Sequence, residues 1–166
     1  MDELAMLDRE AFAQVWDRVD PQRTGLVELA PAAAPAPIGP VDAALQELVA
    51  ECLAGAEIYR VLARRSRRAG GELAALRDQK TAQARRLSAA YFIRSGVRYW
   101  PRPAIPEGLG FLAALRERYL AEGHLHARLE DLSRTTEPDL AELYDQLAQE
   151  TARMARQLRA VVEREM

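Results

Sequence analysis

The sequence predicts an all-α protein, an antiparallel four-helix bundle with a short additional helix near its N-terminus. Its 166 residues suit one domain with a core of ordinary size. The composition is rich in Ala, Leu, Arg and Glu, and only 6% of the residues are aromatic, which favours helices over strands. Four segments repeat apolar side chains at alternating intervals of three and four residues, as helices with one buried face do.

Charge and hydropathy exclude several classes of partner and location. The net charge of −2 predicts no general attraction to nucleic acid or to membranes. No apolar run approaches the roughly 20 residues that span a bilayer, and the acidic start of the chain does not resemble a signal peptide. The single cysteine, Cys52, precludes an intramolecular disulfide and suits a reducing compartment. We therefore expect a soluble cytoplasmic protein without nucleic-acid or membrane partners.

Residues 1–40 are expected to stand apart from the bundle of residues 41–166. Within residues 3–18, apolar side chains recur at helical spacing, which predicts a short amphipathic helix. They include Leu4, Leu7, Phe12, Val15 and Trp16. This helix is expected either to pack on the bundle as a lid or to dock a partner. Four prolines then divide residues 24–40, which predicts an extended arm.

The first bundle helix is predicted over residues 41–68. Its inward positions are Leu45, Leu48, Cys52, Gly55, Tyr59 and Leu62. Gly55 permits a close backbone approach. Four arginines near the end of this helix complement its carbonyl end; a nucleic-acid surface is the alternative, but no aromatic side chains are interleaved with them. They are Arg64, Arg65, Arg67 and Arg68. Gly70 and Gly71 are expected to end the helix and allow a tight reversal.

The second helix, predicted over residues 73–93, has an unusual centre. Its inward positions are Leu73, Leu76, Lys80, Gln83, Leu87 and Ala90. A lysine and a glutamine thus occupy positions that should point into the core, which indicates a polar feature at mid-height. Gly96 ends the helix, and about a dozen residues, including Tyr99 and Trp100, form a connection long enough to cross over one end of the bundle.

The third helix is predicted over residues 109–133, and the fourth ends near Arg164. The inward positions of the third are Leu112, Leu115, Tyr119, Glu122, His126 and Leu129. Those of the fourth are Leu140, Leu147, Thr151, Met154, Leu158 and Val161. Thr135 and Thr136 are expected to cap the fourth helix, with Pro138 in its first turn. The third helix also carries charges that we interpret as a solvated face: Arg116, Glu117 and Arg118.

The pattern of the first two helices is repeated in the last two. Residues 84–87 read Ala-Arg-Arg-Leu, and residues 155–158 read Ala-Arg-Gln-Leu. On this alignment the unusual side chains fall in equivalent layers of two helical hairpins, so they should converge near the centre of the bundle. The six aligned positions are Cys52, Lys80, Gln83, Glu122, Thr151 and Met154.

The segments Glu51–Ala63 and Gln83–Phe92 resemble the first two helices of the ferritin-like superfamily, in particular small rubrerythrin-like bacterial proteins. The resemblance covers residues 41–164. It implies an antiparallel bundle with a crossover between the second and third helices. In that family each hairpin supplies a Glu from its first helix and a Glu-x-x-His from its second, and these side chains bind two metal ions.

The metal ligands of the family are nearly all absent from this sequence. The six ligand positions correspond, in chain order, to Cys52, Lys80, Gln83, Glu122, Thr151 and Met154. Only Glu122 keeps its carboxylate. One carboxylate cannot offset the charge of two metal ions, and the lysine ammonium has no lone pair to offer. We therefore predict that the metal site is lost, that no cofactor is bound, and that ferroxidase and peroxidase activities are absent.

A buried ion pair between Lys80 and Glu122 is predicted to replace the metal. Burying either charge alone would be costly, and pairing the two removes much of that cost. Gln83, Thr151 and His126 are the candidates to complete its hydrogen bonds. In the alternative interpretation, Lys80 extends along its apolar stem to the surface.

A rearranged metal site is the second interpretation of the same residues. Glu122 and His126 lie four residues apart on one helix, with Cys52 across the bundle, and these donors suit zinc. Such a chain would be a rubrerythrin-like metal-dependent oxidoreductase that binds iron or zinc, helped by Glu57 or Glu150. Without a metal, Cys52 is interpreted as a small core residue rather than a nucleophile.

Together these features favour a non-catalytic structural or partner-binding protein over an enzyme. The partner is expected to be a protein whose identity the sequence does not indicate. Its expected contact surfaces are the N-terminal helix with Trp16 and the connection with Tyr99 and Trp100. Formation of a homodimer through helix faces is a further expectation from the resemblance.

Overall fold

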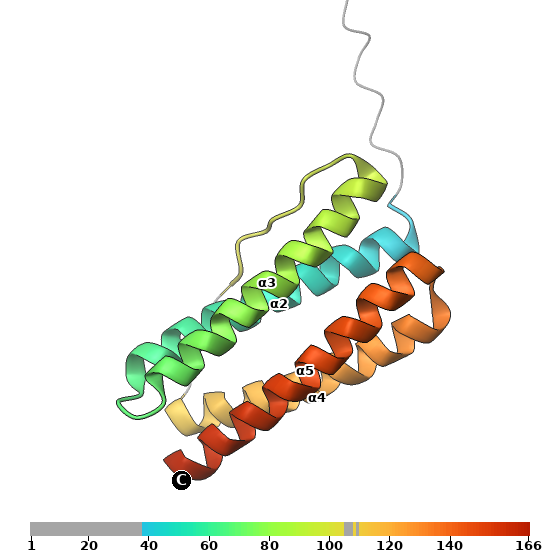
Figure 1. Ribbon diagram of the computed structural model, residues 1–166. Coiled ribbons are helices and arrows are strands. Elements are labelled where there is room, and N and C mark those ends of the chain that lie inside the picture. Colours follow the sequence, from blue (N-terminus) through green and yellow to red (C-terminus); the bar gives the residue numbers. More distant parts are fainter. Residues whose placement is uncertain (1–37, 105–107, 109) are drawn as a thin grey trace, which may run out of the picture. The chain divides into compact units, whose positions relative to one another are not determined.

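The described part of the chain consists of helices and their connections. A computed structural model describes residues 38–104, 108 and 110–166. These residues form no strand, and their four α-helices are α2 (Pro40–Arg65), α3 (Gly70–Ser95), α4 (Phe111–Thr135) and α5 (Pro138–Glu165) (Figure 1). None of these helices combines the length and the apolar character needed to cross a membrane. The helix predicted over residues 3–18 and most of the proline-rich arm lie outside the described residues.

The reversal between the first two helices lies earlier than predicted. α2 ends at Arg65, and in the turn that follows Ser66 Oγ accepts a hydrogen bond from the Ala69 N–H at 2.8 Å. Gly70 is therefore the first residue of α3, and the prediction that the glycine pair ends α2 is wrong. A Cβ at Gly70 would lie only 3.0 Å from the Ala63 carbonyl oxygen. Glycine is needed because the backbones of α2 and α3 approach closely where the chain reverses.

The start of α5 corrects a second prediction. Thr135 belongs to α4, and its hydroxyl donates a hydrogen bond to the Asp131 carbonyl oxygen at 3.0 Å. Thr135 and Thr136 therefore do not cap α5. Glu137 is the N-cap residue and makes no side-chain capping hydrogen bond. Pro138 is the first residue of α5, as predicted, because its ring presets φ for a helix and it has no N–H to leave unpaired.

The helices form two hairpins that contact each other. α2 packs mainly on α3 and α4 mainly on α5, while α2 also contacts α4 and α3 contacts α5 (Figure 1). Near the end of α3, Arg94 pairs with Asp42 at the start of α2 at 2.9 Å, and with Glu137 before α5. At the opposite end, Arg164 of α5 pairs with Glu72 of α3. α3 and α4 therefore run in the same direction, opposite to α2 and α5.

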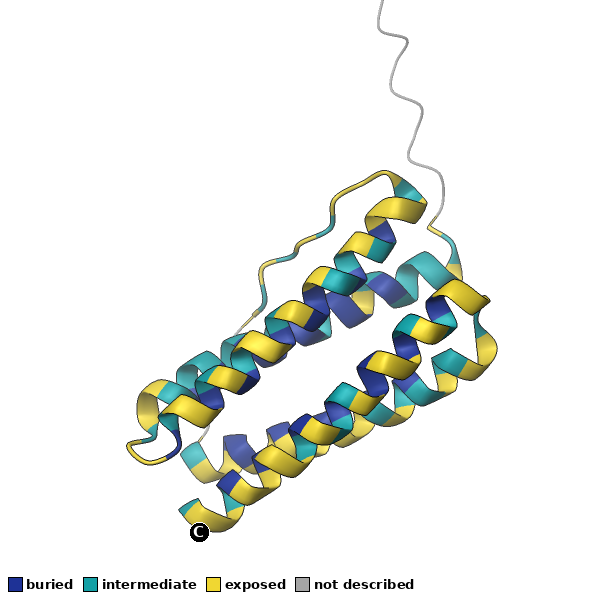
Figure 2. Ribbon diagram, viewed as in Figure 1, coloured by how far each residue is buried: buried dark blue, intermediate teal, exposed yellow. Residues whose placement is uncertain are grey.

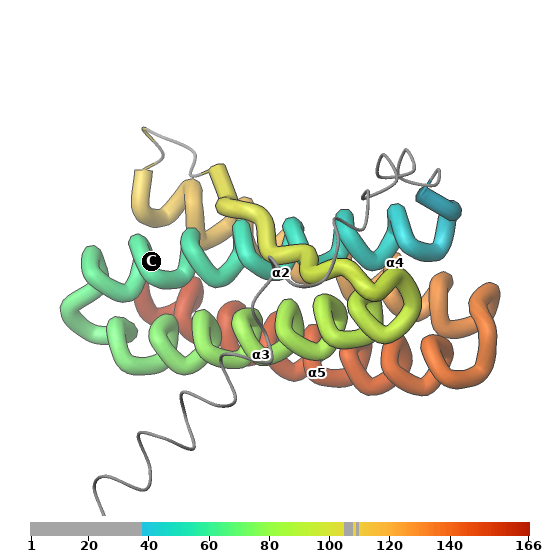
Figure 3. The backbone as a smooth tube through the Cα atoms, turned by 90° about the horizontal axis from the view of Figure 1, so that it is seen from above, coloured from blue at the N-terminus to red at the C-terminus, as the bar shows by residue number. Residues whose placement is uncertain are grey.

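The connection from α3 to α4 returns along the first hairpin. Residues 96–104 run back beside the helices of this hairpin in both views (Figures 1 and 3). Ser88 of α3 donates a hydrogen bond to the Tyr99 carbonyl oxygen at 2.8 Å. The Tyr99 ring also meets the Tyr91 ring edge to face, with centroids 5.8 Å apart. Tyr99 therefore anchors the connection to α3, whereas the neighbouring Trp100 is exposed.

The inward faces of three helices agree with the sequence pattern. Every predicted inward residue of α2 and α5 is buried. The same holds for α3, except that Ala90 is only partly buried. Tyr144 of α5 and Tyr91 of α3 are buried as well, although the pattern did not include them. Regular apolar spacing was therefore a sufficient guide to the orientation of these helices.

The predicted inward face of α4 is only half right, because Leu115, Glu122 and Leu129 are buried and the other three predicted residues are not. Leu112 and Tyr119 are 39% and 38% exposed, and His126 is partly exposed. The residues that α4 buries are Ala114, Leu115, Arg118, Glu122, Leu125 and Leu129. From Leu115 onward the buried residues are separated alternately by three and four positions, as the predicted residues are. The prediction failed because it preferred the aromatic Tyr119 over the charged Arg118 as an inward residue.

A layer of polar side chains divides the apolar interior into two clusters. One cluster includes Leu48 and Leu147, the other includes Leu62 and Leu158, and each draws on all four helices. In Figure 2 the buried residues line the faces that the helices turn towards one another. The buried side chains between the clusters, here named the polar layer, are Lys80, Gln83, Arg118, Glu122 and Thr151.

Candidate functional site

The polar layer contains two cations and one carboxylate that are shielded from solvent. Lys80 and Glu122 are 0% exposed, and Arg118 is 5% exposed. Lys80 is also the only lysine of the sequence, in which every other basic residue apart from the two histidines is an arginine. Charged side chains are almost never buried to this extent unless they are paired. The partners of these three charges therefore decide what the layer can do.

Glu122 is the centre of the layer because three side chains approach its carboxylate. Lys80 Nζ lies 2.7 Å from Oε2. Tyr59 donates a hydrogen bond to Oε1 at 2.9 Å, and Arg118 Nε lies 3.2 Å from the same oxygen. The predicted Lys80–Glu122 ion pair is confirmed, and the alternative in which Lys80 reaches the surface is wrong. The contacts of Glu122 with α2 and α3 connect the two hairpins.

The charged contacts are close, but they are not aligned as hydrogen bonds. Glu122 Oε2, Arg118 Nε and Arg118 Nη2 are buried, and none has a hydrogen-bond partner of suitable geometry among the described residues. The attraction of Lys80 and Arg118 to Glu122 is therefore mainly coulombic, which is effective in an interior of low dielectric constant. Since one carboxylate faces two cations, the polar layer has an excess of positive charge.

Gln83 links the ion pair to α5. Its Oε1 accepts a hydrogen bond from Lys80 Nζ at 3.1 Å. Its Nε2 donates to Thr151 Oγ1 and to Glu150 Oε2, each at 3.3 Å. The predicted role of Gln83 as a partner of Lys80 is confirmed, and Thr151 takes part through Gln83. Because Glu150 is only partly buried, this chain of hydrogen bonds leads from the ion pair to the surface.

Arg118 is the residue of the site that the sequence pattern missed, because it was interpreted as part of a solvated face. Its guanidinium carbon lies 5.8 Å from the centroid of the Tyr59 ring, a cation–π contact. A Cβ at Gly55 would lie 3.1 Å from Arg118 Nη1. Gly55 therefore makes room for this guanidinium rather than for a neighbouring backbone. The position of Arg118, four residues before Glu122, was a signal that could have revealed the pairing.

Gly55→Ala is expected to destabilise the protein, because the added methyl group would displace the Arg118 guanidinium. In an unconstrained helix the same substitution stabilises by roughly 0.5–1 kcal/mol. Here we expect a net loss of about 1 kcal/mol from overpacking. In an Arg118→Met background the helix-forming advantage of alanine should return. Chemical denaturation of the wild type, the two single variants and the double variant measures both effects. Equal stabilisation by alanine in both backgrounds would contradict the close contact between residue 55 and Arg118.

Cys52 and Tyr59 border the polar layer from α2, and both remain protonated at neutral pH. Burial raises the pKa of the Cys52 thiol from 9.0 to about 11, an effect that the charge of Lys80 partly opposes. Burial, together with the charge of Glu122, raises the pKa of Tyr59 well above 10.0. Tyr59 is thus a neutral donor to Glu122. Cys52 is a buried neutral thiol, which agrees with its interpretation as a core residue rather than a nucleophile.

Ionisation of Cys52 is expected to destabilise the fold at alkaline pH. The folded state holds the thiol proton more tightly than the unfolded state, so this contribution to stability is complete below pH 9.0 and is lost as the pH rises to about 11. The loss is at most about 3 kcal/mol. Urea denaturation of the wild type and Cys52→Ala across this pH range measures it. The free energy of unfolding should fall less steeply for Cys52→Ala, and identical slopes would contradict the prediction.

The polar layer does not fit the dimetal centre that the family resemblance implies. Glu122 is the only carboxylate among the six corresponding positions, and each of its oxygens faces a cation. Lys80 and Arg118 would repel a metal ion placed beside it. Gln83 and Thr151 are hydrogen-bonded to each other, and neither is an anionic ligand. The donor set therefore lacks the charge needed to hold two divalent ions.

The structure does not assemble the rearranged site of Cys52, Glu122 and His126 either. His126 Nδ1 lies 3.0 Å from the Ala148 carbonyl oxygen, and its Nε2 lies 3.8 Å from the Glu130 carboxylate. The prediction that His126 completes the hydrogen bonds of the ion pair is therefore not supported by its contacts. Within the described residues, no group of three or more His, Cys, Asp or Glu side chains is placed to hold a metal ion.

Glu57 and Glu150, the carboxylates expected to help a rearranged metal site, have other partners. Glu57 pairs with Arg60 on α2, and the hydrogen bond from Arg60 lowers the pKa of its carboxyl group. Glu150 pairs with Arg86 of α3 at 2.6 Å. Both carboxylates are thus engaged by arginines near the surface. Neither is placed to support a metal beside Glu122.

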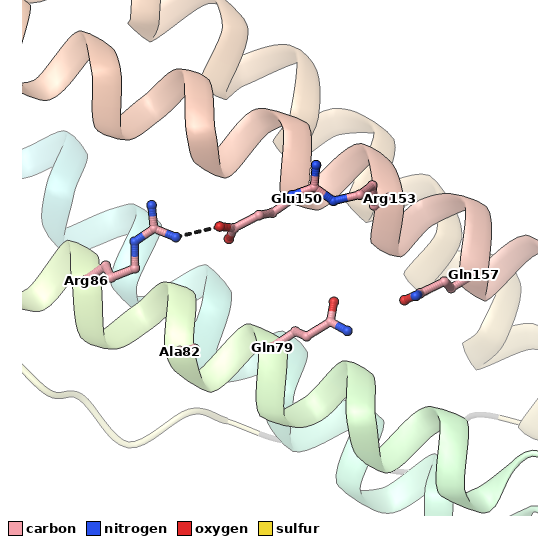
Figure 4. Close-up of a pocket in the computed structure, with 6 residues that line it drawn as sticks. All are labelled: Gln79, Ala82, Arg86, Glu150, Arg153 and Gln157. Carbon is pink, nitrogen blue, oxygen red and sulfur yellow. Dashed lines mark hydrogen bonds and ion pairs between the residues drawn. The ribbon is translucent and has the colours of Figure 1, made fainter.

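A surface pocket between α3 and α5 lies next to the polar layer. Its volume is about 350 Å³, and its lining residues are Gln79, Ala82, Arg86, Glu150, Arg153 and Gln157 (Figure 4). The Arg86–Glu150 ion pair joins α3 to α5 on one side of the lining residues (Figure 4), and Glu150 also accepts the hydrogen bond from Gln83 of the polar layer. The lining contains amides, arginines and one paired carboxylate, and it offers no nucleophile with a neighbouring base.

The function of this chain has to be inferred from its own residues. No family model, curated protein or solved structure matches it. Two features support an inference. One is the neutralised carboxylate at the centre of the polar layer, and the other is the distribution of charged and apolar side chains on the surface.

Proposed function

We propose that this chain is a ferritin-like four-helix bundle that has lost its dimetal centre and serves as a non-catalytic structural or partner-binding protein. One observation carries the proposal: Lys80 Nζ lies 2.7 Å from Glu122 Oε2, at a position where the resemblance implies a metal ligand. The ammonium supplies the positive charge that a metal would supply, and Arg118 adds a second. A metal could bind Glu122 only by displacing these two cations.

The path of the chain supports a ferritin-like arrangement. α3 and α4 run in the same direction, and the described part of the connection between them returns along the first hairpin (Figure 3). Two consecutive helices that run in the same direction need a connection about as long as a helix, and ferritin-like bundles contain one such crossover. We infer that the connection between Ser95 and Phe111 is this crossover.

We infer that the structural role of the polar layer is to fix how the two hairpins dock. Lys80 and Glu122 join α3 to α4, Tyr59 joins α2 to α4, and Gln83 joins α3 to α5 through Thr151. Sliding one hairpin by a helical turn would separate these buried groups, which is costly. Purely apolar layers tolerate repacking better, so a central polar layer favours one register over its alternatives.

Exposed apolar side chains near the end of α3 support a partner-binding role. Ile93 is 82% exposed, and Phe92, Val97 and Trp100 are exposed nearby in the sequence. Clustered apolar side chains on a surface often mark protein interfaces. The homodimer expected from the resemblance stays a prediction, which sedimentation of the wild type and Ile93→Glu tests. A dimer that the substitution dissociates would support it, and a monomeric wild type would reject it.

Metal analysis of protein produced in iron- and zinc-supplemented cells tests the proposed loss of the metal centre. We expect far less than one metal ion per chain, because the two cations beside Glu122 oppose metal binding. Iron or zinc at one or more ions per chain, retained through gel filtration, would contradict the proposal. That result would favour the rubrerythrin-like metal-dependent oxidoreductase instead.

A further inference from the structure

Arginines gather around a surface pocket at one end of the helices. The pocket has a volume of about 440 Å³ and lies where α2 and α5 end and α4 begins. We name it the arginine pocket. Its lining residues are Arg65, Ser66, Arg67, Arg68, Phe111, Arg164 and Glu165. The whole chain has a net charge of −2. The pocket is therefore a local region of positive potential that the average charge conceals.

Neighbouring carboxylates do not neutralise all of these arginines. Arg164 pairs with Glu72 of α3, and Glu165 accepts a hydrogen bond from Ser66 Oγ at 3.0 Å. In contrast, Arg67 and Arg68 are exposed, and neither has a hydrogen bond or ion pair with any residue that the structure describes. Two guanidinium groups of the arginine pocket are therefore available to a ligand.

The polarity of the helix ends does not account for these two residues. Arg65 and Arg164 lie in the last turns of α2 and α5, where cations stabilise the carbonyl ends. Arg67 and Arg68 lie beyond the end of α2, in the reversal that leads to α3. The start of α4 offers them no partner, because its first turn contains no acidic residue. What they share with the other arginines is the pocket that they line.

Phe111 gives the arginine pocket an apolar wall. The guanidinium carbon of Arg65 lies 5.8 Å from the centroid of its ring, so a cation–π contact holds Arg65 at the first residue of α4. A ligand placed against Phe111 would meet the arginines in surroundings less polar than bulk water. Attraction between opposite charges is stronger there.

We propose that the arginine pocket binds a multiply charged phosphate group, carried by pyrophosphate or by a small organic phosphate. A guanidinium donates paired hydrogen bonds to phosphate oxygens. Two neighbouring guanidinium groups suit a tetrahedral group with more than one negative charge better than a planar carboxylate with a single charge. The volume exceeds that of a phosphate group and falls within the range of small-molecule sites. None of these residues belongs to the polar layer, so the proposal is independent of the proposed function.

Isothermal titration calorimetry with pyrophosphate at constant ionic strength tests the arginine pocket. The site variant is Arg67→Gln/Arg68→Gln. The matched control, Arg85→Gln/Arg156→Gln, removes the same charge from exposed positions of α3 and α5 outside the pocket. We expect saturable binding to the wild type, weakened about tenfold or more in the site variant because charge-assisted hydrogen bonds are lost. The control should weaken binding by no more than about twofold, since distant surface charges are screened.

Circular dichroism and melting temperatures of the variants confirm that each is folded, which is expected because the four arginines are exposed. Loss of affinity confined to Arg67→Gln/Arg68→Gln supports the proposal. Equal loss in both double variants would show a response to net charge alone and would overturn it. The absence of saturable pyrophosphate binding to the wild type would overturn it as well.

Discussion

Glu122→Gln is expected to destabilise the protein more than any other single substitution in the polar layer, towards the upper end of roughly 3–5 kcal/mol. The substitution nearly preserves side-chain volume, but it leaves Lys80 and Arg118 as two buried cations without a carboxylate. Tyr59 also loses its charged acceptor. Urea denaturation followed by circular dichroism measures the change in the free energy of unfolding.

Glu117→Gln is the matched control for this prediction. Glu117 lies on the same helix and is exposed, so its substitution should change the free energy of unfolding by less than about 0.5 kcal/mol. If the protein tolerated Glu122→Gln as well as Glu117→Gln, the carboxylate at the centre of the layer would not be balancing the two cations.

Lys80→Met is expected to cost about 3 kcal/mol, a smaller loss than that of Glu122→Gln. Methionine replaces the apolar stem of the lysine and removes only the ammonium group. Glu122 then keeps Arg118 and Tyr59 as partners, so one buried charge loses part of its compensation rather than all of it. The same denaturation experiment measures the difference, and a change near zero would reject the energetic role of the ion pair.

The triple variant Lys80→Met/Arg118→Met/Glu122→Leu separates the effect of charge from that of packing. It leaves no charge of the cluster unpaired, so it should be more stable than Glu122→Gln, since replacing a whole buried cluster by apolar side chains is often neutral or stabilising. If the triple variant is as unstable as Glu122→Gln, the losses arise from altered side-chain packing and not from unpaired charges.

The orientation of α2, α3 and α5 could be predicted because each has one face on which apolar residues recur regularly, even though Lys80 and Gln83 interrupt that face in α3. The six inward positions of α2, from Leu45 to Leu62, illustrate this. α4 offered two overlapping faces of equal regularity, one through Tyr119 and one through Arg118. The contact of Arg118 with the Tyr59 ring of α2 favours the second face, and the apolar spacing of α4 alone contains no information about a contact with another helix.

The ion pair could be predicted, whereas for its second cation the sequence offered only the spacing of Arg118 four residues before Glu122, which does not show that the side chain is buried. Lys80 interrupts an otherwise apolar face, and the internal repeat placed Glu122 at an equivalent height in the other hairpin. The burial of Arg118 depends on the space left by Gly55 of another helix. The prediction that His126 lies at the centre and the prediction that Tyr119 points inward share one cause, a wrong choice between the two faces of α4. The helix instead buries Leu125.

The burial of the only lysine has a practical consequence for the folded chain. At lysine, acetylation, ubiquitin-type conjugation and amine-directed cross-linking all require a side-chain amine that reagents or enzymes can reach, and Lys80 is 0% exposed. The native protein should therefore escape these modifications at lysine. Once the helices separate, the same amine becomes reactive, so mass-spectrometric labelling of Lys80 would count the opened molecules in a population.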